Sequence, residues 1–439
     1  MIETPLYFLL IVISMSLYTA VVIHYINIHL KSKMVFSPLR YVLFTLVPLA
    51  LLAFIDPAAA EEMTATANPT ALNSTSATSH SDENCIGYDS SSRIITIRCK
   101  SATLTDIHKH LNDNSVLDKQ ADGIWLLNAG IVIANDATFI VDSKDTTWLK
   151  IVADGTTAYP IQVFGGLKID SVKLTSWNPE TNDYAQSHGS RETSGKITHP
   201  GAPRPYIRVE KEATGTTDIT NSEIAYLGYE GGWGTGTSGI HYHLAGHGSV
   251  IRNNDIHHLY FGFYSVGVGG MIIENNKVHD MGHYGIDPHT GTHDMVIRNN
   301  TVYGNNGTAI ICSLDCYNIL IEKNVVYNNT GAGIAFSRNM TQSVARDNYL
   351  YNQGRAIHVS QSHNNEIYNN TVSNAKSAIA LISDSSANKV HDNNILNSDT
   401  PLRIDPGLDQ SNSIYANRIE NSSTPDNSPP PPTDTSPPE

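Results

Sequence analysis

The sequence predicts an all-β chain that folds as a right-handed parallel β-helix, a three-faced solenoid with 22–24 residues per coil. Two observations predict this fold. A short phrase recurs along the chain: two apolar residues, two polar residues, an asparagine, any residue and an apolar residue. The asparagines of successive phrases are 22 to 24 residues apart. One such period cannot bury its own apolar side, whereas stacked periods form a continuous core.

The first phrase has four clear copies, four weaker copies and one variant upstream. The clear copies are 250–256, 272–278, 296–302 and 320–326, and the weaker ones centre on Asn348, Asn370, Asn394 and Asn417. We expect the recurring asparagines to stack coil on coil as an amide ladder at a tight turn. Ser222 is expected to occupy the same position one coil before Asn254. The step between those two residues is 32, so an insertion is expected at 231–238.

A second apolar phrase follows each of the first six asparagines after seven or eight residues. Its copies begin at Gly262, Tyr284, Thr308, Ala332, Arg355 and Ser377. Each period therefore holds at least two short β-strands. Leucine-rich repeats need regularly spaced leucines, which are missing here, and a propeller needs about twice this period. Alternating runs at 124–127, 131–133 and 139–141 are expected to form the first coils, so the β-helix domain is predicted to span 122–420, after a cap at 84–121.

The two ends of the chain differ in composition from the repeat region between them. Residues 1–60 contain two apolar runs separated by basic residues, and the second run has the shape of a secretory signal if Met34 is the true start. Otherwise the first run adds a membrane helix. In both cases we expect the basic loop at 31–40 to stay cytoplasmic and everything after residue 60 to be exported. The expected location is therefore secreted, periplasmic or at the cell surface. Residues 61–83 and the Ser/Thr/Pro-rich tail 421–439 are expected to be disordered.

The net charge restricts the classes of binding partner, and the cysteines bear on the redox compartment. The net charge of −14 disfavours nucleic acid and anionic lipid surfaces, and an acidic polysaccharide would need a local basic or metal-containing site. Cys85 and Cys99 are expected to form a disulfide in an oxidising compartment. Cys312 and Cys316 are too far apart to bridge if the segment stays extended, and two buried thiols are as plausible as a disulfide there.

One coil departs from the repeat pattern with the sequence Asp287-Pro288-His289. Segments 265–267 and 311–313 are expected at the same positions in the neighbouring coils. In an extended strand Asp287 and His289 point to one side, so they face solvent together if Ile286 is in the core. Proline removes a ladder hydrogen bond, which a sheet tolerates poorly unless the site is special.

Neighbouring coils are expected to bring further polar side chains to this motif. The register places His243 two coils before His289, with His241 and the tyrosines Tyr264 and Tyr284 nearby, and it places Ser337 and Arg338 two coils after it. Such a stripe suits proton abstraction next to a carboxylate, which needs a base, an acid and a positive charge. The same histidines could instead be turn or surface residues, Asp287 could cap a turn, or the cluster could hold a divalent metal.

These residues resemble the periplasmic mannuronan C5 epimerases of alginate-making bacteria. The resemblance runs from about Ile124 to Asn370 and is carried by 221–229, 260–264 and 284–289. It implies that His289 removes the C5 proton and that Asp287 supports it. The family's motif is Asp-Pro-His-Asp, whose last position is Thr290 here. The family's Ser-Arg-Glu one coil later, whose arginine neutralises the uronate carboxylate, aligns with Ser313-Leu314-Asp315, so that arginine is a leucine here. Arg338 matches a second family arginine, in Ser337-Arg338-Asn339, and is expected to take over its role.

We therefore expect a C5 epimerase of β-D-mannuronate or a related uronate in an extracellular acidic polysaccharide. The residues expected to carry catalysis are His289, Asp287, Arg338, Tyr264 and Tyr284, and those expected to bind substrate are His241, His243, Ser313 and Ser337. A uronan lyase on the same site and a non-catalytic glycan-binding surface protein are the alternatives. No cofactor is expected to be required, Ca²⁺ is an open option, and the chain is expected to be a monomer.

Overall fold

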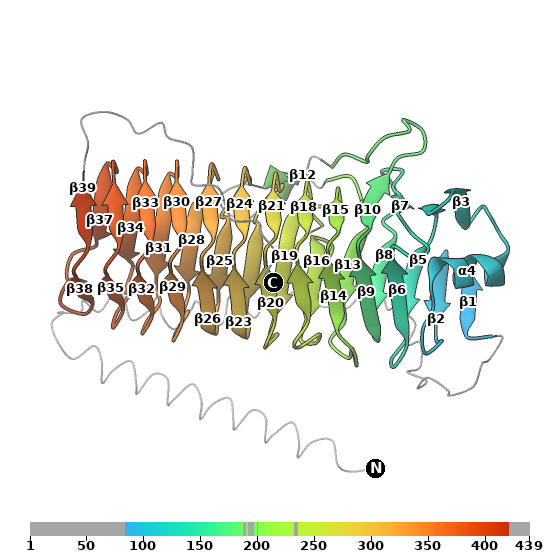
Figure 1. The fold of residues 1–439 in the computed structure, drawn as a ribbon, viewed down its shortest axis with the longest axis horizontal. Helices are drawn as coiled ribbons and strands as arrows, with labels where there is room; N and C mark the ends of the chain where they lie inside the picture. The colour runs from blue at the N-terminus through green and yellow to red at the C-terminus, as the bar shows by residue number, and fades with distance from the viewer. Residues whose placement is uncertain (1–83, 188–189, 192–196, 200, 232–235, 421–439) are drawn as a thin grey trace, which may run out of the picture. The chain divides into compact units, whose positions relative to one another are not determined.

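The structure is a computed structural model. It describes residues 84–187, 190–191, 197–199, 201–231 and 236–420. The predicted membrane or signal segments, the linker 61–83 and the tail 421–439 lie outside these residues. Among the described residues, no helix is both long enough and apolar enough to cross a membrane. The predicted right-handed parallel β-helix is confirmed: the chain winds through three long sheets, coil after coil (Figure 1).

Sheet A has thirteen strands and carries the Asp-Pro-His motif. All neighbours in it are parallel except the first pair, which is an antiparallel hairpin. In spatial order its strands are β1 (Ile86–Asp89), β2 (Ile94–Ile97), β5 (Gly130–Ile133), β8 (Pro160–Val163), β13 (Tyr206–Val209), β16 (Gly239–His243), β19 (Phe261–Val266), β22 (Ile286–His289), β25 (Ile310–Ser313), β28 (Ala332–Ser337), β31 (Arg355–Ser360), β34 (Ser377–Ile382) and β37 (Thr400–Ile404).

Sheet B has eleven parallel strands. They are β6 (Thr138–Asp142), β9 (Gly166–Asp170), β14 (Thr217–Thr220), β17 (Val250–Arg252), β20 (Ile272–Glu274), β23 (His293–Arg298), β26 (Tyr317–Glu322), β29 (Val344–Arg346), β32 (Glu366–Tyr368), β35 (Lys389–His391) and β38 (Ser413–Tyr415). These strands follow the strands of sheet A along the chain, and the clear copies of the first phrase begin in them.

Sheet C has thirteen strands and completes each coil. They are β3 (Leu117–Ala121), β4 (Ile124–Leu127), β7 (Trp148–Val152), β10 (Lys173–Trp177), β15 (Glu223–Ala225), β18 (Asp255–His257), β21 (Lys277–His279), β24 (Thr301–Tyr303), β27 (Val325–Tyr327), β30 (Tyr349–Tyr351), β33 (Thr371–Ser373), β36 (Asn394–Leu396) and β39 (Arg418–Glu420). A separate hairpin, β11 (Ser190–Arg191) and β12 (Ile197–His199), lies outside the three sheets.

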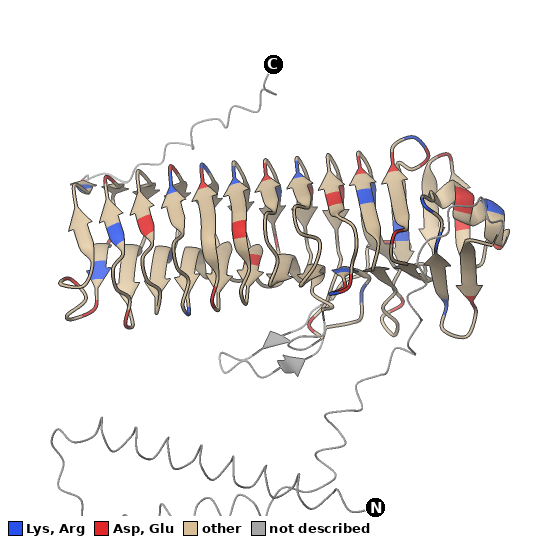
Figure 2. Ribbon diagram, turned by 90° about the horizontal axis from the view of Figure 1, so that it is seen from below, with Lys and Arg blue, Asp and Glu red and all other residues tan. Residues whose placement is uncertain are grey.

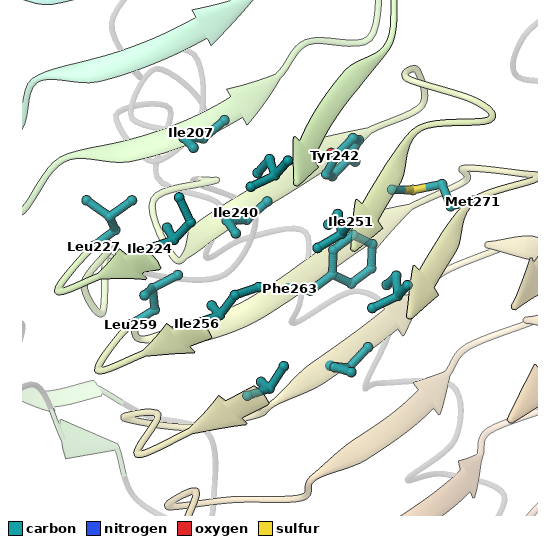
Figure 3. Packing of buried hydrophobic residues seen from close by; sticks show 14 of the residues in the cluster. Ile207, Ile224, Leu227, Ile240, Tyr242, Ile251, Ile256, Leu259, Phe263 and Met271 are labelled. Atoms are coloured by element: carbon teal, nitrogen blue, oxygen red, sulfur yellow. The ribbon is translucent and has the colours of Figure 1, made fainter. Parts of the chain in front are cut away.

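The core is a column of apolar side chains that all three sheets direct inward. Ile240 from sheet A, Ile251 from sheet B and Ile256 from sheet C are at most 1% exposed (Figure 3). Tyr242 and Phe263 lie in this interior with their ring centroids 5.6 Å apart (Figure 3). The Tyr242 hydroxyl donates to the Thr217 carbonyl oxygen at 2.6 Å, which satisfies its one polar atom. Each coil therefore buries its apolar side only against the coils above and below it.

The predicted asparagine ladder is present at the turn between sheets B and C. Each side-chain amide donates to the side-chain oxygen of the next asparagine at 2.9–3.0 Å, along Asn254, Asn276, Asn300, Asn324, Asn348, Asn370, Asn393 and Asn417. Ser222 takes the position before Asn254, as predicted, and its main-chain N–H donates to the Asn254 side chain. The predicted member Asn394 is wrong by one residue, because Asn394 begins strand β36.

The first residues of the described chain form a hairpin and a helix. Helix α4 (Leu104–Leu111) begins with a capping box between Thr103 and Asp106 and ends at Asn112 in the left-handed conformation. Leu104 and Ile107 are fully buried, so the helix covers the apolar interior beside β1 and β3. The predicted disulfide between Cys85 and Cys99 is present, with the two Cα atoms 4.9 Å apart.

Charged side chains are sparse on the strands and recur at the turns between them (Figure 2). An exception is the outer face of sheet B, where Arg252, Glu274 and Arg298 lie in register on successive coils and Glu274 pairs with both arginines. Glu322 and Arg346 continue the alternation, with N–O distances of 2.6–2.9 Å. These pairs tie neighbouring coils together, and we assign them a structural role.

Candidate active site

The Asp-Pro-His motif forms strand β22, within sheet A. Ile286 is fully buried in the core, so Asp287 and His289 lie on the outer face, as the sequence predicts. The register pairs residues 264–266 of β19 with the motif, so the predicted neighbour 265–267 is wrong by one residue. The core decides this register, because the inward side chain of Phe263 must stack on Ile286. On the other side, 311–313 is the neighbouring segment, as predicted.

The outer face is not open to solvent at this motif. Asp287 is 1% exposed and His289 is 8% exposed, so the expectation that both face solvent is wrong. The Tyr264 ring lies 5.4 Å from the His289 ring, and the Arg338 guanidinium contacts His289 from the other side. Ile286 and His289 pair with residues of β25, whereas Asp287 and Pro288 between them do not. The proline has no main-chain N–H to donate.

Asp287 is a buried carboxyl group with no hydrogen-bond partner at either oxygen atom. Burial raises its pKa well above the ordinary value of 3.8, and the positive charge of Arg338 opposes that rise only in part. The group therefore keeps its proton at pH values at which an ordinary aspartate has lost it. The resemblance implied that Asp287 supports His289, but its carboxyl group makes no hydrogen bond to the imidazole. Residues two apart in a strand share a face without their polar ends meeting.

His289 is held at both ring nitrogens by other residues. Its Nδ1 lies 2.6 Å from the Thr290 hydroxyl oxygen, and its Nε2 lies 3.2 Å from a guanidinium nitrogen of Arg338. Burial, and in second place the charge of Arg338, lower the pKa of His289 to about 4. The imidazole is therefore neutral at pH 7, which is the form that can accept a proton.

Arg338 reaches His289 across one intervening coil. Its Nε donates to the Ser313 hydroxyl at 2.8 Å, and Ser313 is the register partner of His289 on the next coil. Ser337 follows one coil later in the same line, and Arg338 comes directly after it with φ 54°. The structure thus brings together His289, Ser313 and Arg338, as predicted, and it gives the site a positive charge at its centre.

The two predicted tyrosines have different surroundings. Tyr264 pairs in register with Asp287, and burial raises the pKa of its hydroxyl. It therefore keeps its proton at neutral pH and lies close enough to the imidazole to share one substrate. Tyr284 precedes β22 and packs against Phe261 at 5.4 Å and His283 at 4.0 Å between ring centroids.

His241 and His243 extend the site toward the N-terminal coils. The register runs from His243 through Val266 to His289, as predicted, and from His241 through Tyr264 to Asp287. The His241 ring lies 4.9 Å from Tyr264 and is 5% exposed. Burial, and after it the charges of Arg208 and His243, lower the pKa of His241 to about 3.

Sequence reasoning missed one residue on this face. Arg208 in β13 lies directly before His241 in the register, and its Nε is 3.2 Å from a carboxylate oxygen of Glu210. Gln162 in β8 precedes it in the same line and donates to Glu210 at 3.3 Å. The sequence signal for Arg208 is the alternation of inward and outward residues at 206–209, which is typical of a short strand.

Cys312 and Cys316 form a second disulfide, with their Cα atoms 6.3 Å apart. The segment does not stay extended, because Leu314 and Asp315 adopt φ values of 66° and 58° and turn the chain back. Both cysteines are fully buried beneath the turn that presents Ser313. Two disulfides are typical of proteins outside the reducing cytoplasm.

Within the part of the chain that the structure describes, no three His, Cys, Asp or Glu side chains are grouped so that they could hold a metal ion. The polar groups around His289 are a hydroxyl, a guanidinium and a phenol, and the first is a weak metal ligand while the second is none. The site as built is suited to acid–base chemistry.

We predict that Asp287→Asn changes the pH dependence of folding stability. The folded state keeps a proton on Asp287 that the unfolded state gives up above pH 3.8, so stability falls as pH rises. Relative to wild type, the variant should gain up to about 1.4 kcal/mol per pH unit above that value, until Asp287 ionises in the folded protein. Urea unfolding at several pH values measures the difference. Asp136→Asn, at an exposed turn, is the control, and a pH-independent difference would contradict the prediction.

Comparisons with known proteins agree with this fold. The family model described as the right handed beta helix region matches residues 207–350, and the model described as periplasmic copper-binding protein (NosD) matches residues 311–429. Comparison with curated proteins gives no match. The crystal structure of the periplasmic alginate epimerase AlgG is similar, with TM-score 0.57 and 19% identity over 75% of this chain and 85% of that chain. A mutant of it has TM-score 0.58 and 19% identity over 74% and 85%. At this identity the likeness shows the fold.

Proposed function

We propose that this protein is an exported enzyme that inverts C5 of β-D-mannuronate, or of a related uronate, in an acidic polysaccharide. One observation carries the proposal: a neutral, buried His289 whose Nε2 faces the guanidinium of Arg338. A base beside a fixed positive charge is what removal of a proton next to a carboxylate requires. The resemblance of the motif region to mannuronan C5 epimerases supports the same chemistry.

In this mechanism Arg338 binds the uronate carboxylate and so leaves the His289 Nε2. That nitrogen then takes the C5 proton, and the electron pair of the broken C–H bond moves into the carboxylate, whose added charge Arg338 neutralises. Tyr264 or a water molecule returns a proton to the opposite face of C5, which inverts the centre. In the structure the Ser313 hydroxyl accepts a hydrogen bond from Arg338 Nε at 2.8 Å, which anchors the arginine beside His289.

Charge supports a carbohydrate acid as the substrate. The chain carries a net charge of −14, but Arg338 stands beside His289 on the outer face of sheet A. A polyuronate would therefore meet positive charge there although the chain as a whole is acidic. The two disulfides support an extracytoplasmic location, where such polymers are found.

The test is incubation of the protein with polymannuronate and related uronans in heavy water, followed by proton NMR. An epimerase should place deuterium at C5 and produce the inverted sugar without shortening the polymer. A lyase shares the first step but expels the 4-linked oxygen, so it would give an unsaturated product that absorbs in the ultraviolet. Binding without any deuterium at C5 would leave only a glycan-binding surface protein, and the proposal would fail.

We predict that the acidic limb of the pH profile lies near pH 4. The value of kcat/KM reports the pKa of the essential base in the free enzyme, and burial lowers the pKa of His289 from 6.5 to about 4. The rate should therefore stay level from pH 7 to about pH 5 and halve near pH 4. Near-ultraviolet circular dichroism over the same range checks that the fold persists. A limb centred at pH 6–7 would contradict a lowered pKa of His289 in the free enzyme.

A further inference from the structure

A left-handed residue ends the sheet A strand in six consecutive coils. These residues are Leu244, Gly267, Thr290, Leu314, Arg338 and Gln361, with φ between 31° and 66°. The main-chain N–H of each donates to a carbonyl oxygen of the next coil, so the turns stack as regularly as the strands. Two members of this line, Thr290 and Arg338, contact the same imidazole, one at each ring nitrogen.

Thr290 is an unfavourable residue for this turn. A β-branched side chain at φ 31° is a backbone outlier, and such residues cost about 1–3 kcal/mol each. The coil before it uses Gly267, which adopts this conformation without that cost. Two ladder hydrogen bonds of 2.9 Å hold Thr290 in place, from its N–H to Ser313 and from Gly267 to its carbonyl oxygen. The fold therefore tolerates strain at the one turn residue that touches His289 Nδ1.

We propose that Thr290 is a positioning residue that holds the His289 ring at Nδ1 and supports the tautomer in which Nε2 is the basic atom. This inference rests on the proposed function for the role of the basic nitrogen, whereas the hydrogen bonds of His289 are seen in the structure itself. A guanidinium can only donate hydrogen bonds, so Nε2, at 3.2 Å from Arg338, must accept. In the neutral ring the proton is then on Nδ1, which donates to the Thr290 hydroxyl oxygen at 2.6 Å.

This arrangement has a consequence for the reaction. When a carboxylate draws Arg338 away, the contact that kept the proton off Nε2 is lost, and the Thr290 hydroxyl oxygen is the remaining acceptor for the Nδ1 proton. Nδ1 keeps its proton before and after Nε2 takes a second one, so the contact with Thr290 need not break during turnover. A neutral hydroxyl also leaves the imidazole less basic than a carboxylate at this position would.

The experiment uses the full chain labelled with ¹⁵N-histidine. The chain has 19 histidines, and the His289 signal is identified by its loss in His289→Gln. The ¹⁵N shifts of the two ring nitrogens report which one carries the proton. Wild type and Thr290→Ser should show a single Nδ1–H tautomer at pH 7. With saturating glucuronate or oligouronate present to draw off Arg338, Thr290→Val should show a mixture of tautomers, and so should Thr290→Gly, which removes the strain as well as the hydroxyl.

The rate of C5 deuterium exchange is measured on the same variants. Thr290→Val and Thr290→Gly should be slower by about ten- to a hundredfold, part of the 10²–10⁴ that a placed general base contributes. Thr290→Ser should stay within about threefold of wild type. An unchanged His289 tautomer in both Thr290→Val and Thr290→Gly would overturn the inference. Absence of exchange in wild type would overturn the proposed function, while the tautomer result would still decide the role of Thr290.

Discussion

Replacing His289 by glutamine is expected to lower the rate of C5 hydrogen exchange by a factor of about 10²–10⁴, the usual contribution of a general base. Glutamine has a similar length and still accepts a hydrogen bond from Arg338, but it cannot take up a proton near neutral pH. The loss should therefore appear in kcat, while the affinity for the polymer changes little. Deuterium incorporation by proton NMR measures the rate, and titration calorimetry with an oligouronate measures the affinity.

His293→Gln is the matched control. His293 begins β23 on sheet B, where it stacks on Tyr317 and pairs with Asp294, away from the outer face of sheet A. The same substitution there should leave exchange unchanged. If His289→Gln retained more than about a tenth of the wild-type rate, another group would have to be the base, and the central role given to β22 would be wrong.

Replacing Arg338 by glutamine is expected to slow exchange by about 10²–10³, as removal of one group that stabilises developing charge commonly does. It should also weaken binding of the uronate, because the carboxylate loses its positive partner. The acidic limb of kcat/KM should move upward, since the charge of Arg338 is one of the two causes that lower the pKa of His289. The limb should stay below pH 6.5, because burial is the larger cause and remains.

A second substitution tests whether the positive charge of Arg338 matters more than the coil from which it comes. Leu314 lies in the line of left-handed turn residues one coil before Arg338. The mannuronan C5 epimerases that the motif region resembles carry an arginine at this position. Adding Leu314→Arg to Arg338→Gln should restore at least a tenth of the lost rate, because the new guanidinium stands beside Ser313. Arg403→Gln, on an exposed part of the same sheet, is the control and should have no effect. A double variant as slow as Arg338→Gln, with normal binding, would count against carboxylate neutralisation as the reason for the loss.

Much of the fold could be predicted from the sequence because the repeat is local. An apolar pair, an asparagine and a second apolar run return every 22–24 residues, and each coil contacts only its neighbours. The errors are of one residue, at Asn394 and at the segment beside the motif. At Asn394 two asparagines stand side by side, so the pattern does not choose between them. The core chooses, because inward side chains must stack.

The sequence by itself determined the solenoid, the outward direction of Asp287 and His289, and the approach of Arg338, since all three follow from the period and the alternation of a strand. Only the tertiary structure decided how deeply the polar groups of the site are buried and which of them contact one another. A one-dimensional pattern gives the side on which a residue lies but not its depth, so it could not tell that Asp287 is buried without a partner. Nor could it tell that Thr290 holds the imidazole, because that contact depends on a left-handed turn fixed by main-chain hydrogen bonds from the coils on either side.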